Sequence, residues 1–144
     1  MKYSIRHLTT SDYNELISLW SKCGLPFRPN GRDSREAIAL EINRTETGFI
    51  GMFDNSRLIG FVLATSDGRK GWINRLAINP DYQRRGLGMQ MIEEAEKFLM
   101  GLGLKVIAAL IEEDNDPSFA TFQKAGYVSH KDIFYYSKRT SPDD

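Results

Sequence analysis

The sequence predicts one α/β (α+β) domain in which a mixed central sheet of about six to seven strands is flanked by about four helices. The length of 144 residues allows one sizeable core but not two. Strand-like and helix-like segments follow one another in the order β-α-α-β-β-β-α-β-α-β. We expect residues 1–138 to form the domain and residues 139–144 a C-terminal tail.

The first half of the chain is predicted to hold a strand, two helices and a hairpin. Residues 2–8 alternate like a short strand, and Thr9 with Asp12 resembles a capping box at the start of a helix. A loop rich in proline and glycine follows, and a second helix is expected to end near Arg44. The supporting residues are Tyr13, Leu16, Ile17 and Trp20 in the first helix, Asp33 or Ser34 as the cap of the second, and Asp54 with Asn55 in the hairpin turn.

The second half is predicted to continue with strand, helix, strand, helix and strand. A strand over residues 72–78 leads through a basic, glycine-rich loop into a helix that begins at Gly86. Residues 104–111 are apolar without alternation, which is typical of a strand buried on both faces. A short helix and a last strand over residues 133–138 complete the order. The apolar stripe expected to hold the long helix in the core consists of Leu87, Met91, Ala95, Phe98 and Leu102.

Composition excludes several classes of function. Lysines and arginines number 19, as do aspartates and glutamates, so no overall charge indicates binding to nucleic acid or to a membrane surface. Cys23 is the single cysteine and cannot form an internal disulfide, and with only His7 and His130 besides it a metal site is not expected. No signal peptide and no apolar run of roughly 18 residues is seen, so we expect a soluble, cytoplasmic protein.

The loop between the strand over residues 72–78 and the next helix has the composition of an anion site. It reads Gln83, Arg84, Arg85, Gly86, Leu87 and Gly88. The first turn of a helix leaves backbone N–H groups unpaired, and its positive dipole end attracts anions. Glycines let a phosphate approach the backbone, and arginines add charge-assisted hydrogen bonds. The loop lacks the Gly-Lys-Ser or Gly-Lys-Thr ending of a nucleoside triphosphate loop and comes too late in the chain for a dinucleotide fold.

This loop resembles the acyl-coenzyme A signature of the GNAT superfamily of N-acetyltransferases. A second stretch, from Asn115 to Tyr127, is similar to the family's pattern of an asparagine, a helix and then lysine, any residue, glycine and an aromatic residue. Both motifs lie on successive strand-helix units, and the similarity covers about residues 70–138. The resemblance implies the GNAT fold, acetyl-CoA as co-substrate, no metal, and transfer of acetyl to a primary amine.

The resemblance also implies how the coenzyme is held. The backbone around residues 76–78 would pair with the pantetheine arm, and residues 83–88 would bind the pyrophosphate. Main-chain donors between splayed strands would hold the acetyl carbonyl and stabilise the oxyanion of a tetrahedral intermediate. Asn115 would hydrogen-bond the pantetheine arm, although a plain helix cap explains it nearly as well. The implied coenzyme contacts are Leu76, Ala77, Ile78, Gln83, Arg84, Arg85, Gly86, Leu87, Gly88, Met89, Asn115, Phe119 and Phe122.

The proton donor departs from the family pattern. Many members place a tyrosine that protonates the departing thiolate where this chain has Phe122. Three explanations stay open. The thiolate leaves unaided, Tyr135 or Tyr136 reaches over from the last predicted strand, or the protein binds acyl-CoA without rapid turnover.

The general base and the acceptor site are specified only as hypotheses. Neither Asn74 nor Arg75 is a convincing base, so we propose a water chain to Glu112 or Glu113, for which a solvated strand end is the alternative. By resemblance, the loop before the second helix lies over the acceptor side of the cleft. The acceptor-side residues considered are Phe27, Arg28, Arg32, Asp33, Trp72 and Asn74, and a solvated charged loop or core packing explains them without a ligand.

We therefore expect an acetyl-CoA-dependent N-acetyltransferase that acts by direct transfer in a ternary complex, as a monomer or a homodimer. The alternative is a non-catalytic acyl-CoA binding or sensing module, which Phe122 keeps open. A covalent route through Cys23 is not expected, because no histidine lies near it in the sequence. Nucleic-acid binding through Arg84 and Arg85 is disfavoured by the balanced charge.

Overall fold

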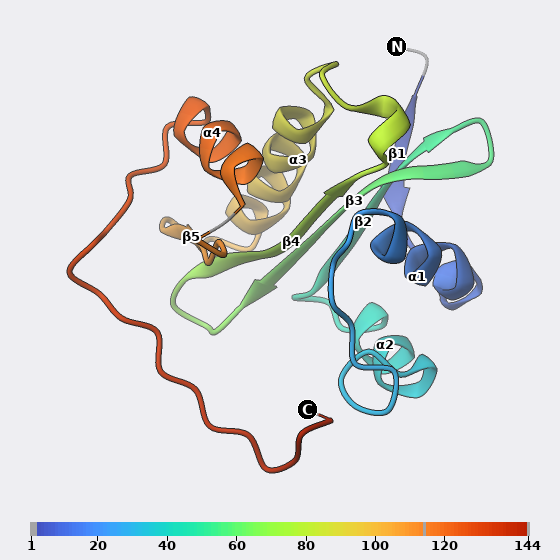
Figure 1. The fold of residues 1–144 in the computed structure, drawn as a ribbon, viewed down its shortest axis with the longest axis horizontal. Coiled ribbons are helices and arrows are strands. Elements are labelled where there is room, and N and C mark those ends of the chain that lie inside the picture. The colour runs from blue at the N-terminus through green and yellow to red at the C-terminus, as the bar shows by residue number, and fades with distance from the viewer. Residues whose placement is uncertain (1–2, 114, 144) are drawn as a thin grey trace.

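The computed structural model describes residues 3–113 and 115–143. Its centre is a five-stranded mixed sheet in the order β1-β2-β3-β4-β5, with α1 and α2 on one face and α3 and α4 on the other (Figure 1). The elements are β1 (Ser4–His7), η1 (Thr10–Asp12), α1 (Tyr13–Lys22), α2 (Arg35–Ile42), β2 (Gly48–Asp54), β3 (Arg57–Ser66), β4 (Gly71–Ile78), η2 (Pro80–Tyr82), α3 (Leu87–Gly101), β5 (Ile107–Ala109) and α4 (Asp116–Lys124). Among the described residues, no helix has the length and apolar character needed to cross a membrane.

Local sequence signals determine where the first helices begin. The backbone N–H of Thr9 donates to the Asp12 carboxylate at 2.8 Å, which confirms the capping box, although a short 3₁₀ turn precedes α1. Ser34 rather than Asp33 caps α2, because its hydroxyl accepts a hydrogen bond from the Ala37 N–H at 3.1 Å. The Asp33 carboxylate instead accepts a hydrogen bond from the backbone N–H of Arg28 at 2.7 Å.

The sheet changes direction once. Strands β1 to β4 pair antiparallel, and Asn55 adopts a left-handed φ of 56° in the turn between β2 and β3, which confirms the predicted hairpin. Strand β5 pairs parallel to β4 because α3 crosses over one face of the sheet before β5 returns. Among the described residues, the β4–β5 ladder runs from Gly71↔Ile107 to Ile73↔Ala109 and no further.

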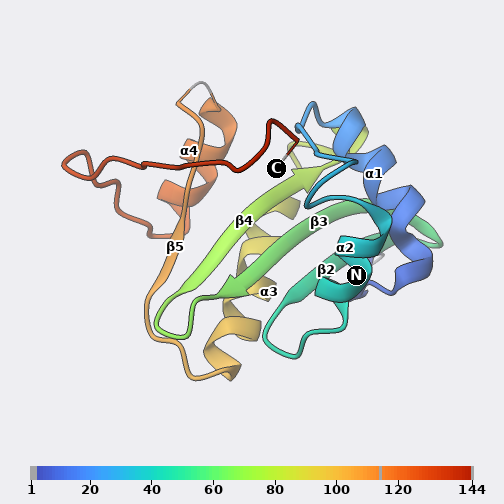
Figure 2. The same ribbon diagram turned by 90° about the horizontal axis from the view of Figure 1, so that it is seen from below.

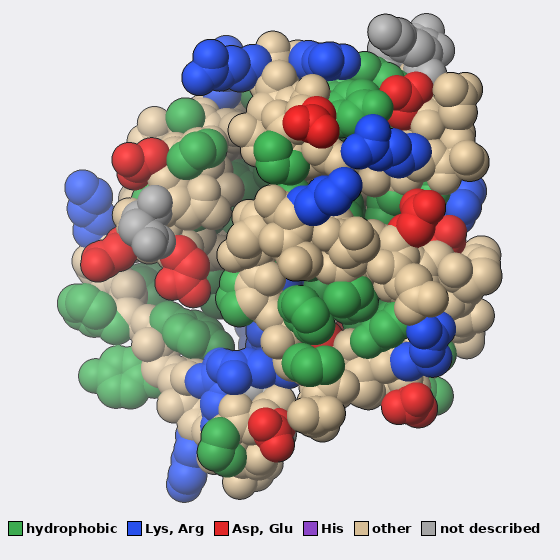
Figure 3. Space-filling view, turned by 45° about the vertical axis from the view of Figure 1, so that its right-hand side comes forward, with side chains coloured by type: hydrophobic (Ala, Val, Ile, Leu, Met, Phe, Trp, Pro, Cys, Tyr) green, Lys and Arg blue, Asp and Glu red, His purple; other side chains and the backbone are tan. Residues whose placement is uncertain are grey.

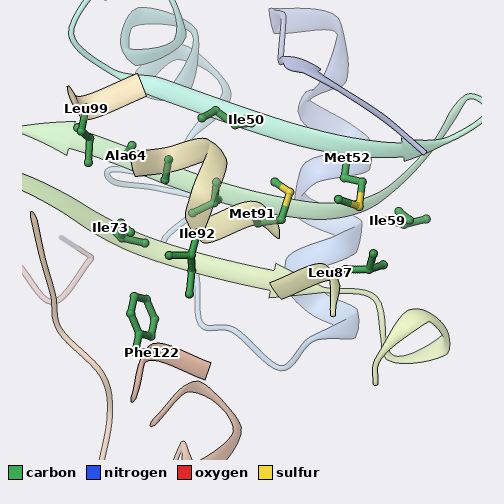
Figure 4. Packing of buried hydrophobic residues seen from close by; sticks show 12 residues of the cluster. Ile50, Met52, Ile59, Ala64, Ile73, Leu87, Met91, Ile92, Leu99 and Phe122 are labelled. Atoms are coloured by element: carbon green, nitrogen blue, oxygen red, sulfur yellow. The ribbon is translucent and has the colours of Figure 1, made fainter. Parts of the chain in front are cut away.

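Two apolar cores lie on opposite faces of the sheet. The larger core packs α3 and α4 against the sheet, and Figure 4 shows Met91, Ile92 and Leu87 of α3 among the side chains of the strands. Leu87, Met91 and Ala95 of the predicted stripe are buried, whereas Leu102 is 41% exposed because α3 ends at Gly101. The second core packs α1 and α2 on the other face.

One strand prediction was wrong and another was too long, and the described residues form a sheet of five strands rather than six to seven. The apolar run over residues 104–111 contributes only the three-residue β5, which is half-buried. Residues 133–138 form no strand, and their large apolar side chains are 70–91% exposed. A strand needs a partner ladder, and this tail instead leaves α4, passes in front of α4 and β5 in the view of Figure 2, and returns toward the α1–α2 loop. There the Arg28 guanidinium donates to the carbonyl of Pro142 at 3.1 Å.

Candidate active site

Strand β4 has a free backbone edge at its carboxyl end. Its ladder with β5 stops at Ile73↔Ala109, so Asn74 to Ile78 have no strand partner on that side within the described chain. A bulge between Ile73 and Arg75 interrupts the ladder with β3 at the same level. The space-filling view shows a hollow between the margin that carries α4 and β5 and the body of the molecule (Figure 3). Unpaired backbone donors and acceptors on this edge are available to an extended ligand.

The turn that follows β4 is held by its own side chains. Asn79 is 2% exposed, and its amide oxygen accepts from the N–H of Asp81 at 2.9 Å. The backbone N–H of Asn79 donates to the carbonyl of Ile59 at 2.8 Å, which fixes the end of β4 against β3. The Gln83 side-chain amide donates to the carbonyl of Ile78 at 3.4 Å. The chain therefore enters the glycine loop in one defined direction.

The glycine loop leaves the N-terminus of α3 without a side-chain cap. Arg84 and Gly86 adopt left-handed φ angles of 64° and 75°, and left-handed residues in a loop can direct N–H groups toward a common anion. Gly86 occupies the cap position, and the first turn of α3 contains no acidic residue. By contrast, Ser34 and Asn115 cap α2 and α4 with side-chain oxygens. The first-turn N–H groups of α3 can thus receive a phosphate, which fits the geometry of an anion-binding helix terminus.

The two arginines of the loop have different surroundings. Arg85 donates to the Tyr3 hydroxyl at 2.8 Å, and its guanidinium lies 5.1 Å from the centre of the Tyr82 ring. Tyr82 in turn donates to the Asp54 carboxylate at 2.7 Å. The Arg84 side chain forms no hydrogen bond or ion pair with the described residues. Arg85 therefore ties the loop to the residue that precedes β1, and Arg84 is available for an anion.

Comparison with known proteins decides the family. The acetyltransferase (GNAT) family matches residues 7–127. The chain belongs to the GNAT acetyltransferase family. The match includes the free edge of β4, the glycine loop and α4.

Solved structures share this GNAT fold. The PaiA N-acetyltransferase from Thermoplasma acidophilum, in complex with coenzyme A, is 25% identical with a TM-score of 0.77, over 87% of this chain and 89% of that chain. The aminoglycoside acetyltransferase AAC(6')-Iy, in complex with a bisubstrate analogue of coenzyme A, gives a TM-score of 0.81 at 16% identity, over 96% of this chain and 99% of that chain. The ribosomal-protein-S18-alanine N-acetyltransferase from Escherichia coli gives 0.71 at 19% identity, over 86% and 76%. The last two support the fold alone.

The predicted coenzyme contacts on β4 and α3 lie together around the glycine loop. Leu76 and Ile78 pack against the larger core, and Ala77 faces the other core, as expected for alternating strand residues. Leu87 is buried, whereas Gly88 and Met89 are half-buried on the first turn of α3. A Cβ at Gly88 would stand 3.6 Å from Thr121 of α4, so α3 and α4 approach closely beside the loop.

Helix α4 places Asn115 as a cap and Phe122 in the core. The Asn115 side-chain oxygen accepts from the Ser118 N–H at 3.3 Å, so the helix-cap interpretation holds in this structure. Phe122 is 5% exposed, points from α4 toward Ile92 (Figure 4) and meets the Tyr127 ring edge-to-face with ring centres 5.0 Å apart. Phe119, on the same helix, is half-buried.

The predicted acid and base residues are not gathered at one point. Glu112 and Glu113 are exposed just after β5, which fits a solvated strand end and leaves them open to water. Tyr135 and Tyr136 are 73% and 91% exposed and lie on the tail rather than on a strand. Cys23 is half-buried and its thiol donates to the carbonyl of Ile78 at 3.3 Å, while burial raises its pKa, which disfavours a thiolate nucleophile.

The predicted acceptor-side residues divide into two groups. Phe27 packs against the second core, and Arg28 and Arg32 lie on the same loop close to Asp33. Trp72 instead donates to the Asp67 carboxylate at 3.1 Å in the β3–β4 turn, at the far end of β4. The exposed side chain of Asn74 donates to the Thr65 hydroxyl at 2.6 Å. Phe27 therefore packs on the core, whereas Trp72 and Asn74 are held by contacts with the β3–β4 turn and β3.

Sequence reasoning did not find two networks beside the site. One is the tie from Tyr3 through Arg85 to the loop, and the other is the buried pair of Arg75 with Asp33. Both join residues far apart in the chain, so no local pattern indicates them. Groups of three or more histidine, cysteine or acidic side chains arranged for a metal were not found in the described ranges.

Proposed function

We propose that the protein transfers the acetyl group of acetyl-CoA to a primary amine by direct attack in a ternary complex. The observation that carries this proposal is the free edge of β4 running directly into the uncapped N-terminus of α3. A ligand with an extended amide arm joined to a pyrophosphate matches these two features in the right order. Coenzyme A has this composition, and family membership supports the assignment.

Different residues along β4, the glycine loop and α3 would bind different parts of the coenzyme. The backbone of residues 76–78 pairs with the amides of the pantetheine arm in the manner of an added strand. The first-turn N–H groups of α3 receive the pyrophosphate, and Arg84 adds a charge-assisted hydrogen bond. Gly86 provides the left-handed turn that leaves the backbone exposed to the phosphates.

The chemistry requires a neutral amine and a departing thiolate. The amine nitrogen attacks the thioester carbon, forming a C–N bond and a tetrahedral oxyanion that backbone N–H groups of the β4 edge stabilise. The intermediate then collapses, the C–S bond breaks, and coenzyme A leaves as a thiolate. The amine loses one proton to water, relayed to Glu112 or Glu113, and the thiolate takes one from solvent.

A second candidate function is binding of acyl-CoA without turnover. Phe122 favours it, because this side chain is buried in the core and has no proton to donate where many relatives carry a tyrosine. We prefer catalysis, since a thiolate is stable enough to leave without an acid. A measurement of turnover distinguishes the two functions.

The test is release of free thiol from acetyl-CoA in the presence of an acceptor panel of amino acids, peptide N-termini, polyamines and aminoglycosides. Thiol release that depends on the acceptor, with the acetylated product identified by mass spectrometry, is the expected result. Tight coenzyme A binding by calorimetry without thiol release for any acceptor would instead support the binding module. Failure to bind coenzyme A at all would contradict both functions.

A further inference from the structure

Arg75 is a buried cation with an incomplete set of partners. Its side chain is 12% exposed, and its guanidinium lies 4.4 Å from the centre of the Trp20 ring. Nη2 lies 3.6 Å from Oδ2 of Asp33, which is longer than a charge-assisted hydrogen bond. Nη1 is buried and has no hydrogen-bond partner within the described part of the chain. Most buried N–H groups are paired, so this one calls for an explanation.

Asp33 cannot fully balance Arg75, because other donors share its carboxylate. Oδ2 accepts from the backbone N–H of Arg28 at 2.7 Å. The same oxygen lies 3.5 Å from Nε of Arg32 and 3.6 Å from Nη2 of Arg75. Two guanidinium groups and a backbone N–H thus converge on a single carboxylate oxygen. The cluster retains excess positive charge.

The neighbouring charges do not remove this excess. Arg28 itself donates from its guanidinium to the carbonyl of Pro142, a neutral acceptor. Glu41 also interacts with Asp33 and Arg32, and burial raises the pKa of its carboxyl. Even as a carboxylate it leaves three arginines, Arg28, Arg32 and Arg75, beside two acidic groups. Lysine or arginine side chains also gather at the lower end of the hollow in Figure 3.

Arg75 lies where an acceptor would meet the thioester. It stands on the unpaired stretch of β4, one residue before the backbone assigned to the pantetheine arm. The coenzyme loop continues into α3 on one face of the sheet, whereas Arg75 projects to the other face, toward Trp20 of α1. A second substrate has to reach the β4 edge from the face that the coenzyme leaves free.

We propose that the acceptor carries a carboxylate beside its amine and that Arg75, assisted by Arg32, binds this carboxylate. The inference rests on the acetyl transfer proposed above. The planar guanidinium matches a carboxylate with two parallel hydrogen bonds, and its contact with Asp33, at 3.6 Å, leaves it without a short charge-assisted bond of its own. A polyamine acceptor would face repulsion from the same cluster, so amino acids or peptides with a nearby carboxylate are the favoured class.

The experiment compares matched acceptors that differ only in this charge. Each amino acid of a panel is assayed beside its amide, with spermidine as the polycation, and kcat/KM is measured by thiol release. The variants are Arg75→Gln, Arg75→Lys and Arg32→Gln, the last at a side chain that is 54% exposed and so poses no folding problem. Arg69→Gln, at an exposed arginine in the β3–β4 turn, is the matched control.

For the best acid-amide pair, the wild type is expected to show a kcat/KM about ten- to a hundredfold higher for the acid than for the amide. This is the factor that a hydrogen bond to a charged group contributes. Arg75→Gln should bring the acid-to-amide ratio of kcat/KM near unity by raising KM for the acid alone. Arg32→Gln should lower this ratio in part, and Arg75→Lys should keep more of the preference for the acid than Arg75→Gln does. Faster acetylation of spermidine than of any acid, or an unchanged ratio in folded Arg75→Gln, would overturn the inference.

A binding measurement separates this inference from the proposed function. Calorimetric titration of the coenzyme A complex with the same acids and amides reports the preference without turnover. Preferential binding of acids without thiol release would support the carboxylate site and contradict acetyl transfer. Thiol release with equal binding of acids and amides would support acetyl transfer and overturn the carboxylate site.

Discussion

The Arg85 guanidinium donates a hydrogen bond to the Tyr3 hydroxyl at 2.8 Å and thereby joins the glycine loop to the segment just before the first strand. The same guanidinium lies over Tyr82, whose ring meets Tyr3 edge-to-face at 5.9 Å between centres. The loop proposed to bind the coenzyme is therefore ordered by a contact outside its own sequence. Ordering a loop before binding reduces the entropy cost of association.

Removing the Tyr3 hydroxyl should weaken coenzyme binding without unfolding the protein. Tyr3→Phe keeps the ring contact with Tyr82 but removes the acceptor for Arg85, so we expect the dissociation constant for coenzyme A to rise about two- to tenfold. Calorimetric titration gives this constant, and the thermal midpoint checks the fold. An unchanged dissociation constant would show that this contact does not order the loop.

Replacing Phe122 with tyrosine, a possible general acid, should not increase kcat. If the thiolate leaves unaided, Phe122→Tyr changes kcat little, and the added hydroxyl costs stability because Phe122 is 5% exposed in the core. Thiol-release kinetics and urea unfolding measure the two effects. A positioned general acid contributes about a hundredfold or more, so a rise in kcat of that size would contradict unaided departure.

Tyr127 should make stability sensitive to alkaline pH. Its hydroxyl donates to Glu96 at 2.7 Å, and burial together with this carboxylate raises the pKa of Tyr127. Because the folded pKa of Tyr127 lies above the unfolded value of about 10, its contact with Glu96 contributes fully to the free energy of unfolding below that pH. This stabilisation is lost as the pH rises through the folded pKa. Tyr127→Phe should lower the free energy of unfolding by roughly 1 kcal/mol at neutral pH.

The alkaline part of this prediction has its own readout. Urea unfolding across the pH range above neutrality should show a smaller alkaline loss in Tyr127→Phe than in the wild type. Parallel losses in the two proteins would mean that ionisation of Tyr127 beside Glu96 of α3 does not cause the alkaline loss of stability.

The sequence predicts those parts of the fold that local patterns determine. The capping box at Thr9, the hairpin at Asn55 and the glycine loop before α3 all depend on neighbours in the chain, and each is present. The buried stripe of α3 follows from helical periodicity alone. Family resemblance added the identity of the coenzyme, which no local pattern supplies.

The errors concern pairing between distant segments. Residues 133–138 have strand composition, but composition does not choose a partner, and the tail lies exposed instead of extending the sheet. The same limit explains why β5 is short, since its outer edge lacks a neighbouring strand in the described chain. Arg75 reads as an unsuitable base in the sequence, and only the fold brings it to Asp33 and Trp20.

The central claim is that the glycine loop at the start of α3 binds the pyrophosphate of coenzyme A. It is tested most directly by comparing Gly86→Glu with Gly86→Gln, which impose the same strain at a φ of 75° and differ only in charge. Calorimetry with coenzyme A should show at least about a hundredfold weaker binding for Gly86→Glu than for Gly86→Gln, while pantetheine, which lacks the pyrophosphate, binds both alike. Equal affinity of the two variants for coenzyme A would place the phosphates elsewhere.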